Sequence, residues 1–143
     1  MDSNYIINAV MKSAGMAIKT GGSAVAKTTV AVLYKISDVI YTALSAGDLP
    51  ALTGISVADG YTKCVLVQVS AGGTVTYKVS DAFANVSGEV FVLANAPSLD
   101  KDKAFVGFIV IKNASGSVFT GGTTALDASN VTVSYIDYPV IGA

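Results

Sequence analysis

The sequence contains no histidine, no tryptophan and no arginine, and it has a single cysteine, Cys64. Without histidine, Ser–His and Cys–His nucleophile pairs and histidine-ligated metals are impossible, and one cysteine cannot form an internal disulfide or a cysteine-rich zinc site. Glu89 is the only glutamate, and most aspartates lie in turn-like contexts, which disfavours a catalytic carboxylate pair. We therefore expect a protein that is not an enzyme and that has no catalytic residues, no metal and no cofactor.

Charge is also scarce. Charged residues make up 13% of the 143-residue chain and mean hydropathy is +0.59, whereas a typical soluble domain carries about 25% charged residues. The formal net charge is −1 and every basic residue is a lysine, so the chain has no basic surface typical of a nucleic-acid partner. So little charge would coat a monomer poorly. We expect a homo-oligomer, with a homotrimer as the first expectation.

Residues 61–80 predict a β-hairpin, because apolar residues alternate along both halves, as strand residues that share one face do. The register that matches the two alternations pairs Val69 with Val75, Val67 with Tyr77 and Val65 with Val79. It leaves Ala71-Gly72-Gly73 as a three-residue loop, a common hairpin connection. Cys64 and Leu66 point to the other face, so something should cover part of that face and bury the thiol.

A second hairpin is predicted over residues 27–43, with Ser37-Asp38 as a two-residue loop. Its register pairs Ile36 with Val39, Tyr34 with Tyr41 and Val32 with Ala43. Residues 104–112 are apolar on both faces, which indicates a central strand or one between the core and a partner chain. Further strands are expected at residues 89–94 and 131–136, and residues 44–60 are expected to be a loop.

The fold class that these patterns predict is mainly β. We expect an antiparallel β-sandwich or flattened barrel of about seven to nine strands, preceded by a short N-terminal helix.

The N-terminal helix is expected over residues 4–20, capped by Asp2 or Ser3 and ended by Gly21-Gly22. Its apolar arc is wide, so it suits docking either on its own domain or on a neighbouring protein. We divide the chain into an apolar helical attachment segment, residues 1–22, and an antiparallel β domain, residues 23–143. The candidate attachment and interface residues are Ile6, Ile7, Val10 and Met11, together with Phe105 and Phe108 of the two-sided strand.

The N-terminal sequence predicts neither export nor membrane insertion. The first residues are acidic rather than basic and Lys12-Ser13 interrupts the apolar run, unlike a signal peptide. A membrane span would need about 20 apolar residues, which the sequence does not provide. We therefore expect synthesis in the cytoplasm without a signal peptide, and no membrane partner.

Two runs carry a resemblance to a known group of proteins. They are FTGGTTALD at residues 119–127, followed by a tyrosine-bearing last strand, and VLVQVSAGGTVT at residues 65–76. With the preceding segments, the chain from about residue 8 to residue 141 resembles small virion structural proteins of tailed bacteriophages. The resemblance implies a capsid-decorating, capsid-cementing or head-fibre protein, multimeric and located on the virion. Its partner would be the major capsid protein or another virion protein.

Two other functions stay open. A tail or fibre component with a host-surface or glycan-binding role would present solvent-facing aromatic residues, and the candidates are Tyr61, Tyr135 and Tyr138. A pilus-like or surface-layer-like subunit would share the strand-rich, low-charge composition but should carry an export signal.

Overall fold

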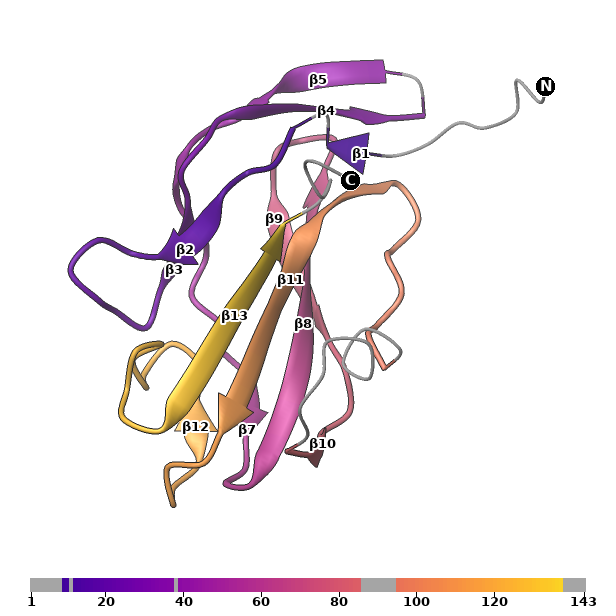
Figure 1. The fold of residues 1–143 in the computed structure, drawn as a ribbon. Coiled ribbons are helices and arrows are strands. Elements are labelled where there is room, and N and C mark those ends of the chain that lie inside the picture. Colours follow the sequence, from indigo (N-terminus) through magenta and orange to yellow (C-terminus); the bar gives the residue numbers. More distant parts are fainter. Residues whose placement is uncertain (1–8, 11, 38, 86–94, 138–143) are drawn as a thin grey trace.

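The computed structural model of the chain describes residues 9–10, 12–37, 39–85 and 95–137. These residues form thirteen strands in three sheets and contain no helix, so the protein is mainly β (Figure 1). The sequence predicts about seven to nine strands. The excess arises because several strands have only two or three residues, too few for a recognisable alternation.

One eight-stranded sheet dominates the structure. Its strands are β1 (Ala9–Val10), β4 (Val32–Ile36), β5 (Val39–Leu44), β8 (Tyr61–Ser70), β9 (Val75–Val79), β10 (Phe83–Ala84), β11 (Lys103–Asn113) and β13 (Val131–Asp137). The long strand β11 pairs with β8 on one side and with β13 and β1 on the other. The expectation that residues 104–112 form a central strand is confirmed. The other ladders are antiparallel, and β1 with β11 is the parallel exception.

Two small sheets complete the fold. One contains β2 (Met16–Ile18), β3 (Ala26–Thr28) and β6 (Gly47–Asp48), and the other contains β7 (Ser56–Val57) and β12 (Phe119–Thr120). One large hydrophobic core takes buried side chains from all three sheets, among them Met16, Val57, Val67, Ile109 and Phe119. The small sheets therefore pack on the same apolar face of the large one.

Both predicted hairpins form. In the β8–β9 hairpin all three predicted pairs occur: Val65 with Val79, Val67 with Tyr77 and Val69 with Val75. In the β4–β5 hairpin Ile36 pairs with Val39 and Tyr34 with Tyr41, but Val32 pairs with Leu44 instead of Ala43. The difference arises from a register shift between Val32 and Tyr34, an irregularity that residue alternation does not reveal.

The predicted N-terminal helix is wrong for the described part of residues 4–20. Ala9–Val10 is β1, between β4 and β11, and Met16–Ile18 is β2, paired with β3. Between them Gly15 has φ +64°, and the Ala14 carbonyl accepts from the backbone N–H groups of Thr29 and Val30. A short apolar segment is a marginal helix in water, so pairing with distant strands outweighs its helical pattern. The expected boundary at residue 22 falls within the β2–β3 connection.

The segment expected to be a loop at residues 44–60 contributes to the core. It contains β6 and β7, and its buried side chains are Leu49, Leu52, Ile55 and Val57. These residues are spaced without a strand or helix period, so the sequence does not show that they face one core. The strand predicted at residues 89–94 lies outside the described residues.

Candidate interaction surfaces

The β4–β5 hairpin, at the top of Figure 1, carries the most exposed apolar side chains of the large sheet. Leu33 is 48% exposed, Val39 52% and Ile40 59%. Lys35 lies directly opposite Ile40 in the ladder, so Ile40 shares the outward face with a lysine. We call Leu33, Val39 and Ile40 the hairpin patch; Val39 lies opposite buried Ile36, so its exposed side chain is on the other face of the strand pair from Ile40. None of these three residues is among the interface candidates expected from the sequence, although the predicted register already places Ile40 opposite Lys35.

The base of this hairpin is anchored to the rest of the molecule. The hydroxyl of Tyr34 donates to the carbonyl of Ser70 at 3.0 Å, where the β8–β9 loop begins. The rings of Tyr34 and Tyr41 stack with centroids 5.6 Å apart. Burial raises the pKa of Tyr34, and Tyr41 beside it raises that pKa further. The inner face of the hairpin is therefore packed, and the patch stands on a supported strand pair.

The outer edge of β5 is the end of the large sheet. Among the described residues, β5 pairs only with β4. Its sequence, VIYTAL, contains no charged residue and no proline, the two commonest protections of an edge strand. The edge therefore lies next to the hairpin patch without a charged side chain of its own strand to shield it.

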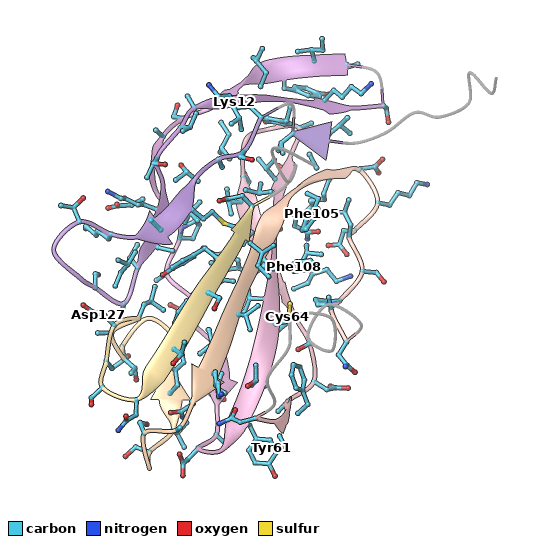
Figure 2. The ribbon with its side chains drawn as sticks, in the orientation of Figure 1. Lys12, Tyr61, Cys64, Phe105, Phe108 and Asp127 are labelled. Atoms are coloured by element: carbon cyan, nitrogen blue, oxygen red, sulfur yellow. The ribbon has the colours of Figure 1, made fainter. Side chains whose placement is uncertain are left out.

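Phe105 and Phe108 are both partly buried along β11, and Figure 2 labels them on neighbouring parts of this strand. Their rings are tilted with centroids 4.9 Å apart. They meet because the ladder with β8 shifts register between Phe105 and Gly107, which brings residues three apart to the same face. Phe108 also packs against a small second cluster around Cys64 and Val110. Much of this predicted interface pair is therefore engaged within the chain itself.

Of the four N-terminal candidates for attachment, the structure describes Val10 alone. Val10 is only 3% exposed and belongs to the core, where it is unavailable as a surface contact in the folded chain. Ile6, Ile7 and Met11 lie outside the described residues. Val10, the one described member of the four, is therefore not an exposed group beside Phe105 and Phe108.

The opposite face of β8 is covered, as the sequence predicts. Asp100 accepts from the Gln68 side chain at 2.7 Å and pairs with Lys78 at 2.9 Å, which holds the segment before β11 against the sheet. Hydrogen bonds from Lys78 and then from Gln68 lower the pKa of Asp100. Ser80 is also buried on this face and accepts from the Cys64 backbone N–H. This polar clamp therefore fixes the segment before β11 to the covered face of β8.

Cys64 is fully buried beside this clamp. Burial raises the pKa of its thiol from 9.0 to about 11, so the thiol stays protonated at neutral pH. The predicted burial of this thiol is confirmed.

The far end of the molecule, at the bottom of Figure 2, presents Tyr61. Tyr61 is 44% exposed and Val118, beside β12, is 58% exposed. Of the other aromatic candidates for glycan binding, Tyr135 is partly buried and Tyr138 lies outside the described residues. Only one of the three candidates is therefore a solvent-facing aromatic in the described structure.

The run FTGGTTALD has a packing role. Phe119 and Leu126 are buried in the core, and the Gly121 N–H donates to the Ile55 carbonyl at 2.7 Å. A Cβ at Gly121 would collide with the backbone carbonyls of Leu52 and Ile55. This run is therefore constrained by its contact with residues 49–57.

Within the described ranges no group of three or more Asp, Glu, Cys or His side chains could hold a metal ion. The part of the chain that the structure describes also offers no helix long and apolar enough to cross a membrane. Comparison with known proteins adds no relative: the chain matches no family model, no curated protein and no solved structure.

Proposed function

We propose that this chain is a non-enzymatic structural protein of a tailed-bacteriophage particle, which decorates or cements the capsid as a homo-oligomer. Its partner would be the major capsid protein or another virion protein. We also propose that its three sheets form a flattened β-sandwich around the large hydrophobic core. The resemblance of residues 65–76 and 119–127 to small virion proteins motivates the biological setting.

The observation that best supports an assembly role is the hairpin patch beside an uncharged sheet edge. About half of each side chain of the hairpin patch is exposed to solvent. Lys35 is the one charged residue in the two described strands β4 and β5. An apolar group exposed next to an open strand edge is typical of a protein that meets another chain. Low overall charge agrees with such burial, since 13% charged residues would coat a free monomer poorly.

Under this proposal, fewer residues of the expected attachment segment 1–22 are available for contact with the particle. Val10, Ala14 and Met16 are core residues, so they stabilise the domain itself. Ile6, Ile7 and Met11 remain candidates for contact with the particle. Burial of such a side chain contributes about 1.5–3 kcal/mol before ordering costs, and a repeating lattice multiplies weak contacts through avidity.

Mass spectrometry of purified particles, with and without their tails, tests the proposal. We expect peptides of this chain in intact particles and in tail-free heads, at a copy number in proportion to the capsid protein. Recovery only with tails would instead support the tail or fibre alternative, with Tyr61 as the first residue to test for glycan binding. Absence from both samples would refute the virion role.

A further inference from the structure

We propose that two copies of this chain associate through the outer edges of β5, pairing antiparallel about a two-fold axis so that two large sheets become one continuous sheet. Among the described residues, β5 has a strand partner on one side only. The occupant that suits an open strand edge is another strand, because its free backbone groups form a regular ladder of donors and acceptors.

The hairpin geometry identifies which backbone groups face outward. Hydrogen-bonded and non-hydrogen-bonded residue pairs alternate along an antiparallel ladder. Next to a two-residue loop the flanking pair, here Ile36 and Val39, is of the hydrogen-bonded kind. The following pair, Lys35 and Ile40, is then of the other kind, so Ile40 directs its N–H and C=O away from β4. Ile40 is therefore central to the pairing edge, and its side chain is the most exposed of the hairpin patch at 59%.

Charge favours a second copy as the occupant. Since Val39–Leu44 contains no charged residue, every antiparallel register of β5 against itself sets uncharged residues opposite uncharged residues. The nearest lysine in the ladder, Lys35, lies on β4. The two copies of Lys35 would be three strand spacings apart, roughly 14 Å. That separation exceeds the Debye length of about 8 Å at physiological ionic strength, so their repulsion is largely screened.

The regular part of the β5 edge is short, and this limits the expected affinity of the dimer. The register shift between Val32 and Tyr34 interrupts the β4–β5 ladder and limits the regular edge to the residues next to the loop. A stable interface buries about 800 Å² per partner, more than a few edge residues supply. We therefore expect reversible, micromolar dimerisation. A two-fold contact also gives a dimer, since a closed trimer would need two different surfaces to meet.

This inference names a surface for the proposed self-association but stands apart from the virion role. Its test uses purified protein alone, whereas the virion role is tested on particles. A chain that dimerises through β5 yet is absent from particles would refute the proposed function and leave this inference intact.

The experiment is sedimentation velocity of the full chain over about 1–200 µM, with two variants at one site and a matched control. Ile40→Lys adds an edge charge, and Ile40→Pro removes the outward N–H, which an edge strand tolerates. Val118→Lys is the control, because Val118 is exposed to 58% but lies beside β12 at the other end of the molecule. Circular dichroism verifies that each variant keeps its β structure.

We expect the wild type and Val118→Lys to approach twice the 14.5 kDa chain mass with rising concentration. Both Ile40 variants should show at least tenfold weaker dimerisation. A wild type that stays monomeric at about 200 µM, or that forms a trimer, would overturn the inference. So would a folded Ile40→Lys protein that dimerises like the wild type, or a Val118→Lys protein that loses dimerisation to the same extent.

Discussion

Met16 tests whether the N-terminal region belongs to the domain or only attaches it to something else. Met16 is 6% exposed and lies in the core, and a Cβ added at Gly107 on β11 would contact its Cε. Truncation of a buried methionine to alanine costs about 2–5 kcal/mol, against a total stability of about 5–15 kcal/mol for a domain. We expect Met16→Ala to lower the urea midpoint by about 1–3 M, given the usual denaturant dependence of a small protein.

Lys12→Ala is the matched control, because Lys12 is exposed and lies between β1 and β2. Its effect should stay within about 0.5 kcal/mol, as for most surface substitutions. Urea unfolding followed by far-ultraviolet circular dichroism measures both variants. If Met16→Ala costs no more than Lys12→Ala, residues 12–18 do not stabilise the domain, and the packing described for β2 is refuted. By the same reasoning, deletion of residues 1–22 should abolish cooperative folding, since it removes β1 and β2 together.

Three further predictions concern buried and ion-paired groups. Cys64 should react with thiol reagents only after denaturation, and stability should fall as pH rises from 9.0 towards about 11, because the unfolded thiol ionises first. This alkaline loss should be smaller in Cys64→Ala, where the buried tyrosines whose pKa is raised, Tyr34 among them, still contribute to it, and rapid native labelling would contradict the burial. Asn113→Ala should cost about 1–3 kcal/mol in urea unfolding, since the fully buried side chain donates to two backbone carbonyls that would lose their donor. The lowered pKa of Asp100 implies a stabilising contribution that is present at neutral pH and lost as pH falls below the ordinary range for aspartate. Asp100→Asn should therefore flatten the acid limb of a stability–pH profile. An unchanged limb would show that the pairs with Lys78 and Gln68 carry no net stability.

The sequence specified the local strand pairings because their determinants are close together in the chain. Period-two alternation and a glycine-containing loop are enough to align Val67 with Tyr77, and a two-residue loop aligns Tyr34 with Tyr41. The two-sided apolar character of residues 104–112 likewise identified the central strand, since such a strand must be covered on both faces. The burial of Cys64 followed from the same alternation.

The tertiary structure determined those features that depend on contacts between residues far apart in the sequence. Ala9–Val10 and Met16–Ile18 lie in a sequence whose apolar pattern also fits a helix, and only their pairing with β3, β4 and β11 makes them strands. Leu52 and Ile55 are buried because the Phe119 region packs on them, a contact between segments more than sixty residues apart in sequence. The exposure of Ile40 is likewise set by the strand order, which leaves β5 at the end of the sheet. A pattern along the chain fixes which face a side chain takes, but what covers that face is a non-local contact and is determined only when the chain folds.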